Sequence, residues 1–359
     1  MDTRNLVVGS RVDSGELGTG TVTFVGADRI GIAFDGGSEM LVHRENLERE
    51  ARAQPASAAP PRTGLPWPAS TFVSDDDVAE HFLGSHWDPF VDDASELLKR
   101  LPQMLQESEI QNGFASVHGV PRRDPADWVK GFTLVWPDAR QGLAAASRIE
   151  PERTLLISLF PFFALGSQHT LTLREVRVWK SGVEAQVTAD WARGEVTFFD
   201  THFLINRAWY DTGKPYDFIL AGLAYSAGPA HQRQWEIDRH PDEVAWLNQQ
   251  RTPGEAPHEA RYTLGLDGAA VLLPVDDWDV DDFSFHAPVK SVTEFKDWLG
   301  QDGWRVRATV MRMGDEDGDL DILITRRAWS GVAPPQVGQD IEGRLWLQGR
   351  LWTPLSKHG

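Results

Sequence analysis

Short stretches in which apolar and polar residues alternate dominate the first fifty positions of the chain. The clearest is IGIAF, where Ile30, Ile32 and Phe34 lie on one face of an extended backbone. Turns rich in glycine and aspartate separate it from similar stretches on either side. We therefore predict a small closed β-barrel whose strands are Leu6–Val12, Gly20–Val25, Arg29–Phe34 and Met40–His43.

The stretches VGSRV, GTGTVTFVG and IGIAFDGG resemble the SH3-like small barrels, a group that includes the Tudor, KOW and CAP-Gly domains. This resemblance covers residues 1–50 only. A Tudor-type cage needs several aromatic rings around its ligand, but the module has only Phe24 and Phe34, which the pattern places in the core. Nine acidic residues against five arginines also disfavour a nucleic-acid-binding role. The resemblance therefore implies a module that contacts protein.

A change of composition marks the end of this first module. Residues 51–70 contain no aspartate or glutamate, and proline and alanine fill eleven of the twenty positions. Such a composition is typical of a semi-extended linker. We expect this linker to separate the small barrel from a differently built body.

Helical spacing of apolar residues follows the linker. Ser74 stands directly before Asp75–Asp77, an arrangement that predicts the N-terminus of a helix. A second helix is predicted by apolar residues that recur every three or four positions, at Phe90, Ala94, Leu97, Leu98 and Leu101. Pro102 should kink or restart that helix. We therefore predict a helical segment over residues 71–150 that leads into a β-rich body.

From Trp128 onward the pattern is mainly that of strands. The predicted strands are Trp128–Trp136, Thr154–Phe160, Thr170–Trp179, Val183–Trp191, Glu195–Asp200, Phe203–Ala208 and Tyr216–Tyr225. Two short helices are expected among them, Asp242–Gln249 after Pro241 and Val292–Leu299 behind a capping box. The predicted fold class is mainly β with some α.

A repeated block suggests that the body contains two copies of one β unit. Leu204–Trp209 reads LINRAW and Leu323–Trp329 reads LITRRAW, and each is followed by a glycine and a further strand. We predict two related, OB-like units at 151–260 and 261–359 in which these blocks are equivalent. Strict alternation would place the leucine and isoleucine of each block on opposite faces of a sheet.

Composition removes several classes of protein. The 35 basic and 53 acidic side chains give a net charge of −18, which disfavours duplex DNA as a ligand. The absence of cysteine excludes disulfides, thiolate nucleophiles and cysteine-based zinc sites. The longest apolar run, Leu155–Leu165, is too short to span a bilayer, and the first residues lack the pattern of a secretory signal. We therefore expect a cytoplasmic protein that does not contact membranes.

Acidic residues concentrate in one part of the body. Residues 241–300 carry 12 acids and 4 bases. At the centre of this part, five aspartates surround Trp278, namely Asp276, Asp277, Asp279, Asp281 and Asp282. Such a run is either a solvated loop or a contact surface for a basic partner in which Trp278 serves as the anchor.

A second candidate site has the chemistry of a metal or acid–base pair. In Asp200-Thr201-His202 a carboxylate and an imidazole share one face of an extended segment. Two other patterns fail on inspection: Ser226 in AYSAG lacks the helix that a nucleophile elbow requires, and Asp315–Asp321 lacks the glycine and glutamate of a calcium loop. No phosphate-binding or dinucleotide-binding loop is found, so no cofactor is expected.

Three functions from different classes remain open. The sequence favours a non-enzymatic interaction protein that binds a protein partner through the loop around Trp278, and the acidic residues of this loop favour a basic partner. The first alternative is an OB-type binder of single-stranded nucleic acid or oligosaccharide. The second is a metal-dependent hydrolase centred on Asp200 and His202.

Overall fold

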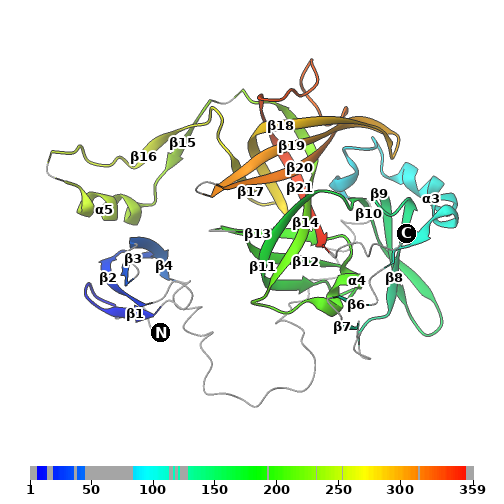
Figure 1. Cartoon of the computed structure of the whole chain (residues 1–359), viewed down its shortest axis with the longest axis horizontal. Coiled ribbons are helices and arrows are strands. Elements are labelled where there is room, and N and C mark those ends of the chain that lie inside the picture. The colour runs from blue at the N-terminus through cyan, green and yellow to red at the C-terminus, as the bar shows by residue number, and fades with distance from the viewer. Residues whose placement is uncertain are drawn as a thin grey trace, which may run out of the picture. The chain divides into compact units, whose positions relative to one another are not determined.

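The computed structural model describes residues 6–13, 19–35, 39–44, 84–112, 116–117, 120–121, 128–191, 194–231, 233–252, 254–313 and 316–352. The chain divides into two compact units (Figure 1). These units are Met1–Gly64 with Gln234–Gly265, and Leu65–Arg233 with Leu266–Gly359. The linker predicted at 51–70 and the helix predicted from Ser74 lie outside the described residues. Among the described helices, none has the length and apolar composition needed to cross a membrane.

The first unit contains an antiparallel meander of four strands in the order β1-β2-β3-β4. The strands are β1 (Arg11–Asp13), β2 (Thr19–Val25), β3 (Arg29–Phe34) and β4 (Glu39–His43). Its buried core consists of Leu6, Val12, Val22, Ile30, Ile32 and Phe34. The first strand is shorter than predicted because residues 7–10 form a turn, in which the Gly9 N–H donates to the Val22 carbonyl at 2.8 Å. Within the described residues β1 and β4 do not pair.

A hairpin from the middle of the chain completes this unit. It consists of β15 (Gln234–Asp238), α5 (Pro241–Gln250) and β16 (Arg261–Gly265). The helix α5 matches the helix predicted at Asp242–Gln249, because Pro241 occupies its first turn and the His240 ring accepts a hydrogen bond from the Asp242 N–H.

The second unit is built around a nine-stranded sheet in the order β11-β12-β13-β21-β14-β20-β19-β18-β17. Its strands are β11 (Ser167–Val178), β12 (Ala185–Trp191), β13 (Gly194–Asp200), β14 (Pro215–Pro229), β17 (Val271–Pro274), β18 (Asp282–Trp298), β19 (Gln301–Met313), β20 (Glu316–Thr325) and β21 (Asp340–Leu351). The prediction of a mainly β fold is confirmed.

Two halves of this sheet have the same strand order. In each half a three-stranded meander is followed by a fourth strand that pairs with the first: β11-β12-β13 with β14, and β18-β19-β20 with β21. The third strand of each half runs parallel to the fourth strand of the other, β13 with β21 and β20 with β14. The bulges correspond too, since Arg174 in β11 and Lys290 in β18 are the extra residues opposite the next strand. The sheet therefore closes into two five-stranded rings that share β14 and β21.

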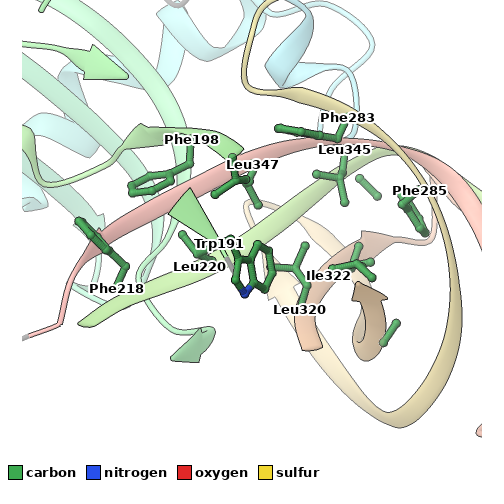
Figure 2. Close-up of a cluster of buried hydrophobic side chains, with 14 of the residues drawn as sticks. Trp191, Phe198, Phe218, Leu220, Phe283, Phe285, Leu320, Ile322, Leu345 and Leu347 are labelled. Carbon is green, nitrogen blue, oxygen red and sulfur yellow. The ribbon is translucent and has the colours of Figure 1, made fainter. Parts of the chain in front are cut away.

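Two apolar cores lie on opposite faces of the shared strands. Leu345 and Leu347 of β21 belong to a core that receives side chains from both halves (Figure 2). Trp346, between them, points to the other face and joins the second core. The second core fills the space against a four-stranded sheet and a helix, which together cover this face.

The covering layer contains the four-stranded sheet β10-β9-β8-β5 and the helix α3. Its elements are α3 (Ser95–Glu107), β5 (Glu109–Ile110), β8 (Gly131–Pro137), β9 (Gln141–Ile149) and β10 (Thr154–Phe163), preceded by the short helix η3 (Ser85–Trp87). A two-stranded hairpin, β6 (Ser116–Val117) and β7 (Val120–Pro121), lies between β5 and β8 in the chain. The alanine-rich β9 was not predicted, and α3 continues through Pro102 to Glu107 instead of restarting there.

The helix predicted at Val292–Leu299 is wrong. These residues continue β18, where Val292 pairs with Val306 and Glu294 with Trp304 of β19. The strand ends in a tight turn, with Asp297, Leu299 and Gly300 at positive φ. Pairing with a neighbouring strand thus outweighs the local capping signal.

The strand predicted at Phe203–Ala208 is also wrong, since this segment forms α4 (Phe203–Asn206) and the short helix η4 (Arg207–Trp209). The LINRAW and LITRRAW blocks are therefore not equivalent throughout, because Leu323 and Ile324 lie in β20. In β20 the expected alternation holds: Leu323 faces the second core and Ile324 the first.

Candidate functional site

The structure divides the predicted acidic cluster into an outer and an inner part. Asp276 and Asp277 are exposed in the turn between β17 and β18, where Asp277 has a φ of 64°. Asp281 and Asp282, by contrast, are 0 % and 6 % exposed. Two backbone hydrogen bonds close the turn: the Val275 N–H donates to the Asp282 carbonyl at 3.0 Å, and the Asp282 N–H donates to the Asp279 carbonyl at 3.0 Å. The cluster is thus an anchored turn with exposed acids at its tip.

Trp278 lies at the tip of this turn with 43 % of its surface exposed. Its ring meets Tyr225 edge to face, with 5.6 Å between centroids. The Arg344 guanidinium lies 4.9 Å from the indole centroid. These contacts hold the indole in one position while one side of it stays open to solvent.

Tyr225 links the turn to the interior. It is the bulge residue of β14, placed where the β14–β21 register shifts between Ala224 and Ser226. Its hydroxyl donates to Asp282 Oδ1 at 2.7 Å and lies 2.6 Å from His86 Nδ1. Because the phenol has one proton and gives it to Asp282, we infer that His86 Nδ1–H is the donor in the second bond. The bulge thereby turns this side chain toward both partners.

The inner side of the site is an aromatic stack with two anchored carboxylates. The His86 ring, carried by η3, stacks on Trp346 with 3.8 Å between centroids and 15° between planes. The Trp346 indole N–H donates to Asp281 Oδ2 at 3.1 Å. Asp279 accepts a hydrogen bond from the Gln186 amide at 3.0 Å. Five elements, namely η3, β12, β14, β18 and β21, thus fix the base of the turn.

Burial and the neighbouring carboxylates determine the charge state of the site. Burial, together with Asp282, Asp281 and Asp279, raises the pKa of Tyr225 well above its ordinary value. The phenol therefore stays protonated and acts as a hydrogen-bond donor rather than as a nucleophile. This arrangement holds an acidic and aromatic surface in a fixed position.

The second candidate pair, Asp200 and His202, lies elsewhere in the unit. Asp200 Oδ1 accepts from the His202 backbone N–H at 2.9 Å and from the Asn206 amide at 2.8 Å, while Tyr210 donates to Oδ2 at 2.5 Å. The His202 Nδ1 is bonded to the Thr201 hydroxyl at 2.9 Å. The Asp200 carboxylate therefore binds the backbone of His202 at the start of α4, while the His202 ring binds the Thr201 hydroxyl.

Burial favours the neutral form of both side chains. It raises the pKa of Asp200 to about 7, against the hydrogen bonds from Tyr210, His202 and Asn206. It also lowers the pKa of His202 to about 3, aided by the positive charge of Arg350. Within the described residues, no group of three or more histidines and carboxylates could hold a metal ion.

The other sequence patterns have structural roles. Ser226 lies inside β14, which continues to Pro229, so no helix follows it. Asp317 and Asp319 in β20 bind Lys290 at 2.8 and 2.7 Å, and Asp321 binds Arg307 at 2.8 Å. These acids are thus neutralised by basic side chains of β18 and β19.

Sequence reasoning missed four members of the site: His86, Tyr225, Arg344 and Trp346. The sequence around each residue contains no motif typical of a binding site, and the four residues come from three separate elements, η3, β14 and β21. The one available signal was AYSAG, which marks an irregular strand position but which we interpreted through its serine.

Searches against family models, curated proteins and solved structures found no match.

Proposed function

We propose that this protein is a non-enzymatic interaction protein that binds a basic segment of a partner protein on the β17–β18 turn. The observation that carries the proposal is the exposure of Trp278 at a fixed position between Tyr225 and Arg344. Tryptophan is among the residues that most often dominate the binding energy of a protein interface.

The surroundings of Trp278 favour a partner with both positive and apolar groups. Asp276 and Asp277 at the tip of the turn supply negative charge, and the chain as a whole carries −18. Leu273 and Val280, on either side in sequence, are 49 % and 40 % exposed. A segment with lysine or arginine next to an apolar side chain would complement this surface.

Preorganisation further supports binding. Ordering a side chain at an interface costs conformational entropy, and that cost is reduced when the side chain is already held in place. The hydrogen bonds from Tyr225 and Trp346 to Asp282 and Asp281 fix the base of the turn. The indole is therefore presented by a rigid support.

The OB-type alternative has a topological argument in its favour. In each ring a three-stranded meander is closed by two more strands, one of which is parallel to the third strand, as in an OB barrel. However, the side chains facing away from the first core on β12 and β13 include the polar residues Gln186, Thr188, Asp190, Glu195 and Thr197, and the aromatic residue among them, Phe199, is fully buried in the second core. Base stacking requires aromatic side chains, so this surface gives the nucleic-acid alternative little support. The hydrolase alternative is weakened because the His202 N–H, the Asn206 amide and the Tyr210 hydroxyl already bond to both oxygens of Asp200.

A peptide selection tests the proposal. Random peptides are selected on the full-length protein, and the affinity of the enriched peptides is measured for wild type, Trp278→Ala and Asp276→Asn/Asp277→Asn. We expect the selected peptides to be enriched in lysine and arginine. They should bind Trp278→Ala about 30-fold more weakly than wild type, which corresponds to about 2 kcal/mol. Their association should be slower with the double variant and at high salt. Glu152→Gln, an exposed acid outside the turn, is the matched control. Equal binding to wild type and Trp278→Ala would reject the proposal.

A further inference from the structure

Side chains of the helix α5 contact one face of the meander in the first unit. Three backbone N–H groups in the β2–β3 turn, those of Ala27, Asp28 and Arg29, bind the carboxylate of Asp242, with Asp242 Oδ2 at 2.7 Å from the Asp28 nitrogen and 3.1 Å from the Arg29 nitrogen. Successive backbone N–H groups of this kind form an anion-binding concavity. Burial opposes the charge of Asp242, but these hydrogen bonds outweigh it and lower the pKa of the carboxyl.

Two glycines of the meander provide the space for this helix. A Cβ atom at Gly26 would lie 2.3 Å from Asp242 Cγ, and one at Gly31 would lie 2.8 Å from the Trp246 Nε1. Neither glycine has a positive φ. These glycines are therefore needed because α5 approaches closely, and not because the backbone adopts a conformation that only glycine favours. Trp246 follows Asp242 by four residues, one helical turn, so both side chains meet the meander from the same face of α5.

The contact has the features of a ligand rather than of a permanent core. None of the α5 side chains is fully buried. Further contacts are partly exposed: the His240 ring, just before α5, lies 3.3 Å from Asp28, Arg29 lies 3.6 Å from Glu243, and the Gln249 amide donates to the Thr23 carbonyl at 3.3 Å. Partly exposed ion pairs contribute little to stability. The two partners are also far apart in sequence, since about 200 residues separate Phe34 from Gln234.

We propose that this face of the meander is a recognition site for a helix with an aspartate in its first turn and a tryptophan one turn later. In this chain α5 fills the site as an intramolecular ligand, and an equivalent helix of a partner protein displaces it. The N–H groups of the β2–β3 turn select the carboxylate, and Gly31 admits the indole.

Hydrogen exchange of the full-length protein tests the intramolecular part. In Asp242→Asn the amides of Asp28 and Arg29 should exchange at least about tenfold faster than in wild type, because a hydrogen bond to a charged group is lost. Gly26→Ala should have the same effect by steric exclusion of Asp242. Glu255→Gln, an exposed acid of the same hairpin, is the matched control. Protection of the β3 amides after Arg29, those of residues 30–34, must be retained in every variant, which shows that the meander is still folded. Unchanged exchange at Asp28 and Arg29 in both Asp242→Asn and Gly26→Ala would overturn the proposal.

A synthetic peptide with the sequence of residues 238–252 tests recognition by a separate molecule. Added to the full-length variant Asp242→Asn/Trp246→Ala, it should restore protection of the Asp28 and Arg29 amides, whereas the same peptide with Asp242→Asn should not. Failure of the wild-type peptide to protect these amides at saturating concentration would overturn the proposal. If exchange in the wild-type protein instead depends on its own concentration, the helix is supplied by a second copy of the chain, and the assignment to a partner protein is wrong.

Discussion

At the scale of single residues, Asp200 and His202 oppose each other in the pH dependence of stability. Folded Asp200 keeps its proton up to a pKa of about 7, while the unfolded residue releases it near 3.8. Its contribution is therefore largest at low pH and declines as pH rises from 3.8 to 7. Folded His202 resists protonation down to a pKa of about 3, against 6.5 when unfolded, so its contribution declines as pH falls from 6.5 to 3. Between these limits the two slopes offset each other.

Single substitutions should reveal how each residue makes the unfolding free energy depend on pH. Asp200→Asn preserves the acceptor for the His202 and Asn206 donors and can donate to Tyr210, but it no longer titrates. Relative to wild type, its unfolding free energy should rise between pH 4 and 6.5, by up to about 1.4 kcal/mol per pH unit. His202→Asn should show the opposite trend. Urea unfolding at several pH values measures both, with Asp267→Asn as the exposed control. Profiles parallel to that of wild type would contradict the assignment.

Two tryptophans of the candidate site should differ sharply in their effect on folding. Trp278 is 43 % exposed and Trp346 is fully buried. We expect Trp346→Ala to lower the free energy of unfolding by about 3–5 kcal/mol and Trp278→Ala to lower it by less than about 1 kcal/mol. Thermal or urea unfolding of the two variants provides the comparison. A large loss for Trp278→Ala would identify it as a core residue and remove the main support for a docking surface.

At the scale of elements, the bulge in β14 decides how the acidic turn is attached. It directs Tyr225 to both His86 and Asp282, which belong to η3 and β18. Tyr225→Phe removes both hydrogen bonds but keeps the ring against Trp278. We expect a loss of about 1–3 kcal/mol in unfolding free energy. Faster hydrogen exchange should be confined to η3 and the β17–β18 turn.

Tyr262→Phe is the matched control for this variant, because Tyr262 lies in β16 of the other unit and contacts Arg239 through its ring face. Its stability should stay near that of wild type. If Tyr225→Phe is equally silent, the hydroxyl does not anchor the turn.

At the scale of the whole second unit, the two halves of the sheet should unfold together. Each five-stranded ring is closed by the fourth strand of the other half, through the parallel pairs β13–β21 and β20–β14. Gly343→Ala tests this coupling, since its Cβ would lie 2.1 Å from the Ser226 carbonyl oxygen in the shared β14–β21 ladder. We expect a loss of about 1–3 kcal/mol, with hydrogen exchange increasing in both meanders.

Val332→Ala provides the control for that experiment, because Val332 is fully exposed in the β20–β21 connection. Loss of protection in β18–β20 alone, with β11–β13 unchanged, would show that the halves are independent units.

The sequence by itself determined the features that depend on local pattern. Alternation in Arg29–Phe34 located β3 to the residue, and Pro241 located the start of α5. The mainly β class and the strands β11, β12, β13 and β14 of the large sheet followed from the same periodicity. The sequence also brought Trp278 and the surrounding aspartates to attention, because acidic runs and tryptophans are visible without a structure.

Only the tertiary structure decided the features that depend on partners distant in the chain. Val292–Trp298 is a strand because β19 supplies its hydrogen bonds, whereas the capping signal is local and weaker. Asp281 is buried while Asp277 is exposed because Trp346, some 65 residues away, binds one of them. Contacts between His86, Tyr225 and Asp282 likewise join segments up to about 200 residues apart. Periodicity reports which face of an element is buried, but not which element covers it, and that choice sets the chemistry of the site.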